Sequence, residues 1–146
     1  MNGGNRFARR LVRLVLIAAT AGAMGHAGSV LAQEVTVTLS GNQEIPPVTT
    51  PATGTGMLTV GPDRSISGKV TISGMVATVA HIHEAAAGAN GAIIVPLTKG
   101  ADNEWVVPPG AKLTDAQFEA YRAGRLYFNI HSEAHRSGEI RGQIKP

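Results

Sequence analysis

Alternation of apolar and polar residues with a period of two constrains the fold of this sequence more than any other feature. Side chains on a β-strand point alternately to the two faces of a sheet, so this period predicts strands with one buried face. In the first such segment, Val35, Val37 and Leu39 alternate with threonines. Further strands are predicted over 54–60, 66–72, 79–83, 91–97, 104–107, 125–131 and 138–144. Eighteen glycines and eight prolines punctuate the chain, and short strands with such turns predict an all-β sandwich or barrel.

One segment departs from this pattern and predicts a short helix over 115–122. Thr114 is a good N-cap residue, and Gln117 follows three residues later, as a capping box requires. Gly124 suits the C′ position, where the chain leaves the helix in a left-handed conformation. We expect this helix to cover one end of the domain.

Two segments are predicted to be connections. Residues 40–53 contain three prolines and are expected to be extended. Residues 84–92 are rich in alanine and glycine and are expected to form a flexible loop.

The first 32 residues have the parts of a secretory signal peptide. Arginines between Arg6 and Arg13 form a positive start, and an apolar run of ten residues follows over 14–23. This run is shorter than the roughly 20 residues that a transmembrane helix needs. Val30 and Ala32 then precede Gln33 at the −3 and −1 positions of a cleavage site. We therefore predict a single periplasmic or secreted domain over 33–146, with a retained N-terminal anchor as the alternative.

Removal of this segment changes the charge of the protein. It holds four of the 13 basic residues and no acidic residue, which leaves nine basic against ten acidic residues, a net charge of −1 in place of +3. Binding to nucleic acid requires a basic face on the folded domain and is not expected. No membrane contact is expected after cleavage.

The sequence contains no cysteine, and this excludes disulfides, thiolate metal sites and cysteine nucleophiles. Phosphate-binding glycine loops and the G-x-S-x-G motif of serine hydrolases are also absent. No motif identifies an enzyme, so we expect a binding protein rather than a catalyst.

The four histidines of the domain form two clusters, His81 with His83 and His131 with His135. Residues i and i+2 of a strand share a face, so the first pair can converge on one ion. Alternation places His81, His83 and His131 on strand faces that point away from the core. If their strands are neighbours, these three meet under the 84–92 loop, with His135 as a possible fourth ligand. Imidazole binds copper and zinc well; the alternative is that the histidines only form structural hydrogen bonds.

A second polar pattern lies in the last strand, where Glu139 and Arg141 share the outer face. They are expected to form a structural ion pair with each other or with a neighbouring strand. In the alternative, Glu139 or Asn129 orients a metal-binding histidine through its second ring nitrogen.

Four motifs in this order resemble the CHRD (chordin) domain family. They are GNQEIPPV at 41–48, HIHEAAAGANGAIIVPL at 81–97, GRLYFNIHS at 124–132 and GEIRGQI at 138–144. The resemblance runs from about Val35 to Ile144 and implies an extracellular or periplasmic β-sandwich.

The HIH strand followed by a glycine-containing loop is also distantly similar to the copper-binding strand of copper/zinc superoxide dismutases, which are Greek-key sandwiches. By this likeness His81 and His83 match the strand pair, and His131 matches a later ligand. No bridging histidine lies between His83 and His131, and the family disulfide is impossible without cysteine.

Three functions remain open from the sequence. The first is a small exported module that binds a metal ion, with copper favoured and zinc as the alternative. The second is a structural or interaction domain that binds an unidentified extracytoplasmic protein. The third, which we rank lowest, is a copper-dependent oxidoreductase similar to superoxide dismutase. A shared fold alone does not decide among them.

Overall fold

A computed structural model describes residues 31–146. The predicted signal peptide, except for Leu31 and Ala32, lies outside the described residues. These residues form nine strands, one α-helix and one 3₁₀ helix. The strands are β1 (Gln33–Ser40), β2 (Thr53–Val60), β3 (Ile66–Ser73), β4 (Ala77–Glu84), β5 (Ala92–Pro96), β6 (Thr98–Lys99), β7 (Glu104–Val106), β8 (Leu126–Ser132) and β9 (Ile140–Ile144). The helices are η1 (Gly41–Gln43) and α1 (Asp115–Arg122).

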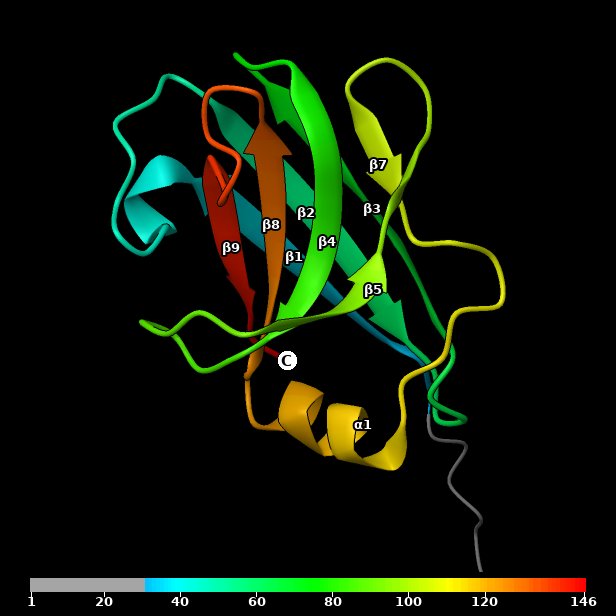
Figure 1. Ribbon diagram of the computed structural model, residues 1–146. Helices are drawn as coiled ribbons and strands as arrows, with labels where there is room; N and C mark the ends of the chain where they lie inside the picture. The colour runs from blue at the N-terminus through cyan, green and yellow to red at the C-terminus, as the bar shows by residue number, and fades with distance from the viewer. Residues whose placement is uncertain (1–30) are drawn as a thin grey trace, which may run out of the picture.

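The strands form one antiparallel sheet in the order β5-β4-β8-β9-β1-β2-β3-β7-β6. β5 and β6 are at opposite ends of this order, yet only Leu97 separates them in the chain. The Leu97 N–H donates a hydrogen bond of 2.9 Å to the Ala80 carbonyl of β4. The sheet therefore curls into a nearly closed barrel (Figure 1). The last strand, β9, lies beside the first, which gives the Greek-key-like order β9-β1-β2-β3.

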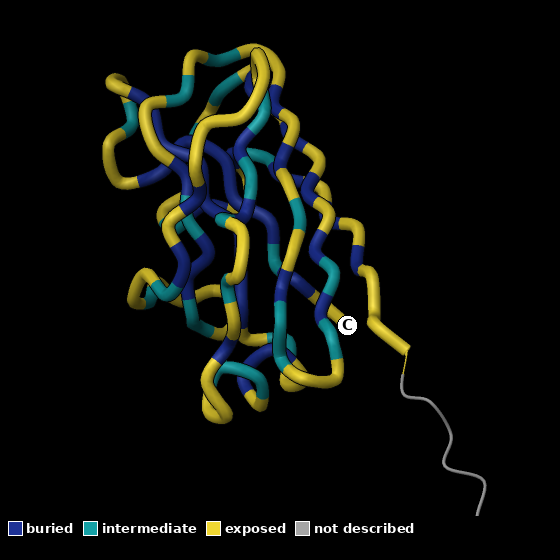
Figure 2. Tube along the Cα trace, turned by 90° about the vertical axis from the view of Figure 1, so that its right-hand side faces the viewer, coloured by how far each residue is buried: buried dark blue, intermediate teal, exposed yellow. Residues whose placement is uncertain are grey.

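The predicted all-β fold and its eight strands are confirmed, with ends displaced by a few residues. Buried and exposed residues alternate along β1 and β2, as the period of two requires, and Figure 2 shows this alternation along the chain trace. β6 was not predicted, because a strand of two residues is too short to show a period. The connection 40–53 is not wholly extended, because it begins with η1.

Apolar side chains from all around the barrel fill its interior. Those with no measurable exposure are Leu39, Leu58, Val70, Ile82, Leu126, Phe128, Ile130, Ile140 and Ile144. Gly56 of β2 makes room for the Phe128 ring, because a Cβ at position 56 would lie 2.8 Å from two ring carbons. At close-packed density such a fit leaves little room for added atoms.

The predicted helix has both of its expected caps. Thr114 accepts a hydrogen bond from the Gln117 N–H, and the Gln117 side chain accepts one from the Thr114 N–H. Gly124 has a φ of 67°. Its N–H and that of Arg125 donate to the carbonyls of Tyr121 and Ala120, at 2.8 Å each, which forms a Schellman motif. The helix lies across one end of the barrel, where Ala120 and Tyr121 are buried (Figure 1).

Within residues 31–146, no helix combines the length and the hydropathy of a membrane span.

Close contact between β9 and β1 depends on Gly142. A Cβ at this position would lie 2.5 Å from Val37 Cγ1 and 2.8 Å from the Thr38 carbonyl oxygen, which belongs to the main chain and cannot move alone. We expect Gly142→Ala to lower the free energy of unfolding by about 1–3 kcal/mol, the usual effect of overpacking. Urea unfolding measures this change. Ser137→Ala, in an exposed turn, is the control and should change stability by less than about 0.5 kcal/mol; equal stability of the two variants would contradict the role of Gly142.

Candidate functional site

The candidate site lies on the outer face of β4, β8 and β9, opposite the barrel interior. In the register of β4 and β8, His81 is opposite Asn129 and His83 is opposite Tyr127. His131 follows Asn129 by two residues on β8 and therefore shares its face. On the other side of β8, Asn129 is opposite Arg141 of β9. Neighbouring strands thus bring the predicted polar residues together.

This outer face lies outside the barrel interior, as expected, but most of it is buried. The exposed fractions of Tyr127, Asn129 and Arg141 are 1%, 3% and 1%, and every residue of β8 is buried. The segments 41–53 and 84–92 fold over the face and contact it through hydrogen bonds. A period of two tells which face a residue occupies, but not whether loops from elsewhere cover that face.

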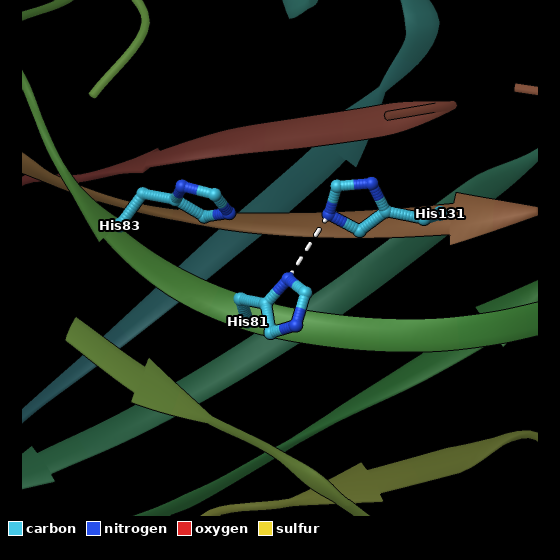
Figure 3. Close-up of side chains that lie close together, drawn as sticks. All are labelled: His81, His83 and His131. Atoms are coloured by element: carbon cyan, nitrogen blue, oxygen red, sulfur yellow. Dashed lines mark hydrogen bonds between the residues drawn. The ribbon is translucent and has the colours of Figure 1, made fainter. Parts of the chain in front are cut away.

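Three histidines converge on this face. His81, His83 and His131 each offer a ring nitrogen, and these nitrogens lie within 4.8 Å of one another. The closest pair is His81 Nδ1 and His131 Nε2, at 3.1 Å (Figure 3). His83 and His131 are buried, with 7% exposure each, whereas His81 is half-buried. The expectation that these three residues meet is therefore confirmed.

Main-chain carbonyls fix the tautomers of the two buried histidines. His83 Nδ1 lies 3.0 Å from the Gly91 carbonyl oxygen, and His131 Nδ1 lies 2.9 Å from that of Arg136. A carbonyl can only accept, so each Nδ1 must carry the hydrogen. Each Nε2 is then unprotonated, and that of His131 accepts from His81 Nδ1–H at 3.1 Å. His83 Nε2 is buried and has no hydrogen-bond partner.

Burial keeps these imidazoles neutral. Burial, together with the neighbouring His131 and His83, lowers the pKa of His81 to about 4. Burial also lowers the pKa of His83, against the raising effect of the Gly91 carbonyl. The pKa of His131 is lowered for the same reason, against the Arg136 carbonyl. At neutral pH no proton therefore competes with a metal ion for the ring nitrogens.

Gly91 connects the histidine cluster to the loop that covers it. Its carbonyl accepts from His83, and its N–H donates to the Tyr127 hydroxyl at 3.1 Å. Only glycine fits here, because a Cβ would lie 1.8 Å from the Glu84 carbonyl oxygen. The Tyr127 ring stacks on the His83 ring, with centroids 4.9 Å apart and planes inclined by 13°.

Arg141 holds the same loop from β9. Its guanidinium donates to the carbonyls of Ala89 at 2.8 Å and Ala86 at 3.3 Å. It also lies over the Tyr127 ring, with Cζ 3.6 Å from the centroid, a cation–π contact. Gln143 adds a hydrogen bond of 3.0 Å to the Ala85 carbonyl. The loop 84–92, expected to be flexible, is therefore bound along much of its length.

Neither role predicted for Glu139 is found. Glu139 accepts a hydrogen bond of 2.6 Å from the Thr50 hydroxyl, and among the described residues no ion pair joins it to Arg141. The groups that orient His83 and His131 are main-chain carbonyls rather than Glu139 or Asn129. The last strand thus uses its polar residues to hold the covering segments. Carbonyl partners could not be predicted, since any residue type supplies one.

His135 does not belong to the group of three. It lies in the turn after β8, half-buried, where its main-chain N–H donates to the Ser132 hydroxyl. Its carbonyl accepts from the N–H groups of Ser132 and Gly138. These main-chain hydrogen bonds hold residue 135 in the turn.

The site should make the stability of the metal-free protein depend on pH. In the unfolded chain His81 becomes protonated below about 6.5, whereas in the folded protein its pKa is about 4. The contribution of His81 to the free energy of unfolding should therefore be fully present above pH 6.5 and be lost as the pH is lowered towards 4. Urea unfolding in the presence of a chelator measures it as the difference in free energy of unfolding between the wild type and His81→Gln. This difference should fall as the pH is lowered from 6.5 to 4, and the difference for the control His135→Gln should not; a constant difference for His81→Gln would contradict the assignment.

Comparison with known proteins agrees with this architecture. The model of the CHRD domain family matches residues 35–144, which extend from β1 to the end of β9 and include the three histidines and both covering segments. No curated protein and no solved structure matched the chain, so the likeness to copper/zinc superoxide dismutases stays a prediction. The match over most of the sequence shows that the chain belongs to the CHRD domain family.

Proposed function

We propose that this CHRD domain binds one transition-metal ion through His81, His83 and His131, with copper favoured and zinc as the alternative. One observation carries the proposal. The Gly91 and Arg136 carbonyls hold the hydrogens of His83 and His131 on Nδ1, so that two unprotonated Nε2 atoms face the same point. Hydrogen-bonding of the second ring nitrogen in this way is typical of histidines that bind metals.

The dimensions of the cluster support a metal ion of this kind. Ligand nitrogens lie about 2.0–2.1 Å from zinc, which separates two such nitrogens by roughly 3.3 Å in a tetrahedral site. The pair His81 Nδ1 and His131 Nε2 is already at 3.1 Å, and no pair exceeds 4.8 Å. Rotation of side chains alone would therefore complete the site. Three protein ligands leave a fourth position for an exogenous ligand.

We also propose that the domain works outside the cytoplasm, as a periplasmic or secreted module that buffers or delivers the metal. The support is the signal-like segment at 1–32 together with the family. Without cysteine, such a domain relies on packing and on a bound ion for its stability.

A second candidate function is an interaction domain without metal, and one observation favours it. His81 Nδ1 and His131 Nε2 are at hydrogen-bond distance, so these two nitrogens satisfy each other. Only His83 Nε2 is then left without a partner. A paired copper/zinc site like that of superoxide dismutases has no support in residues 31–146, which contain no second group of three metal ligands.

Metal titration of the tag-free protein tests the proposal. At pH 7.5 we expect isothermal titration calorimetry to give one ion per chain, with copper(II) bound more tightly than zinc. Alanine substitution of His81, His83 or His131 should each weaken binding at least about tenfold. His135→Ala is the matched control and should bind like the wild type. Binding weaker than about 100 μM in the wild type, or equal binding by all variants, would favour the interaction domain.

The export part of the proposal has a separate test. We expect the mature chain to begin at or near Gln33, because Val30 and Ala32 precede it at the −3 and −1 positions. Intact-mass analysis of protein recovered from the periplasm or the culture medium measures the start of the chain. Exported protein that still carries Met1 would contradict the prediction and favour a retained anchor.

A further inference from the structure

A second unusual feature of the outer face is the burial of Glu44. This residue follows η1 in the segment 41–48, and its exposed fraction is only 4%. A carboxylate so deeply buried normally needs an ion pair or several hydrogen-bond donors. Among the described residues no ion pair joins Glu44 to a basic side chain. Its side-chain hydrogen bond comes from Asn129 Nδ2 to Oε2, at 3.5 Å.

Two buried acceptor atoms of these residues have no donor. Glu44 Oε1 and Asn129 Oδ1 both lack hydrogen-bond partners. Both lie beside Gly138, where a Cβ would be 2.7 Å from the first oxygen and 2.5 Å from the second. Turning the Asn129 amide over would exchange its oxygen and nitrogen, but one carboxylate oxygen would still face an acceptor. Buried polar atoms are rarely left unpaired, so this pair calls for an explanation.

One proton on the carboxylate satisfies both atoms. A carboxylic acid donates through its O–H group and accepts through its carbonyl oxygen, and an amide offers the complementary pair. We propose that Glu44 is a neutral carboxylic acid in the folded protein, that its Oε1 hydroxyl donates to Asn129 Oδ1, and that this acid–amide pair is a pH-sensitive latch that holds the segment 41–48 over the histidine face. This proposal does not depend on a metal ion.

The surroundings of Glu44 favour the neutral form. Burial raises its pKa to about 7, and this effect outweighs Arg141 and the hydrogen bonds from Asn129 and Ile45, which lower it. The charged and titratable groups on this face are Arg141 and Glu139 at β9, Tyr127 on β8, and His81, His83 and His131 on β4 and β8. The Arg141 guanidinium is directed to the carbonyls of the 84–92 loop instead of Glu44. The three histidines have lowered pKa values and are uncharged at neutral pH.

Loss of the proton would weaken the attachment of this segment. An ionised Glu44 would place a charge beside the unpaired Asn129 oxygen, which is unfavourable in a buried site. The remaining hydrogen bonds from the segment to the rest of the domain come from Ile45 and Gln43. The Ile45 carbonyl accepts from the Asn90 side chain at 2.9 Å, and the Gln43 side chain donates to the Thr38 carbonyl at 2.9 Å and accepts from the Gln143 N–H at 3.4 Å. Within the segment, Val48 N–H donates to the Gly41 carbonyl at 2.9 Å. Above pH 7 the segment should therefore open more often, and the face beneath it should become more accessible.

The ionisation of Glu44 changes the stability of the protein with pH in a definite direction. In the unfolded chain Glu44 ionises near 4.5, whereas in the folded protein it ionises near 7. The folded state thus holds one more proton in this window, and stability from Glu44 is present below pH 4.5 and lost as the pH rises through 7. This slope is opposite to that of His81. Comparison of the wild type with a variant that differs only at Glu44 cancels the contribution of the histidines.

Glu44→Gln tests the latch, because glutamine has the shape of the neutral acid and can form the same pair with Asn129. Unfolding by urea from pH 4 to 9, without metal, gives the folding equilibrium constant of each protein. We expect the folding equilibrium constant of the wild type, divided by that of Glu44→Gln, to fall by up to about tenfold per pH unit between 5 and 7 and to level off above 8. Glu34→Gln, at an exposed position of β1, is the matched control and should show no such fall in this window.

Amide hydrogen exchange gives an independent readout of the covering segment. The protection factor of the Val48 amide should decrease between pH 6 and 8.5 in the wild type and stay constant in Glu44→Gln. The proposal would be overturned if the ratio of the two folding equilibrium constants did not change with pH and Glu44→Gln were less stable than the wild type. Glu44 would then be ionised in the folded protein. Stabilisation of the wild type, but not of Glu44→Gln, by added sodium or calcium would overturn it in favour of a cation at the two oxygens.

Discussion

The buried guanidinium of Arg141 is the interaction on which the histidine site depends most. A barrel strand presents one face to the core and the other to solvent unless something covers it. Here the covering loop has small side chains, and alanine and glycine bury too little apolar area to hold it. Arg141 instead binds two of its carbonyls and packs on Tyr127. Charge-assisted hydrogen bonds to main-chain carbonyls thus replace the missing apolar contacts.

Position and tautomer of His83 both follow from this arrangement. The loop held by Arg141 ends at Gly91, whose carbonyl accepts from His83 and whose N–H reaches Tyr127. Tyr127 in turn lies between the His83 ring on one neighbouring strand and Arg141 on the other. A main-chain carbonyl cannot rotate independently of its segment, so a fixed loop gives a fixed imidazole. The cluster is therefore preorganised by backbone contacts and needs no carboxylate behind the histidines.

Periodicity was sufficient to predict most of the fold, and its limits are clear from particular residues. Alternation identified the outer faces that carry His81, His83 and His131, and neighbouring strands then brought these residues together. The same alternation could not show that Tyr127 and Asn129 are buried, because the covering segments come from distant parts of the chain. Nor could it predict Glu44, a lone acid in a proline-containing segment whose partner lies 85 residues away. His135 is close to His131 in sequence, yet the turn places it outside the group of three.

Burial shifts the pKa values of the acid and of the bases on this face in opposite directions, and in both cases it favours the uncharged form. It raises the pKa of Glu44 and lowers those of the three histidines, because a site shielded from water disfavours charge of either sign. At neutral pH the histidines are uncharged, and Glu44, with a pKa of about 7, is near its point of ionisation. Arg141 is then the one permanent positive charge among the named residues of the layer, and it donates hydrogen bonds to loop carbonyls. The segments that exclude water from the face therefore also set the protonation states of the groups beneath them.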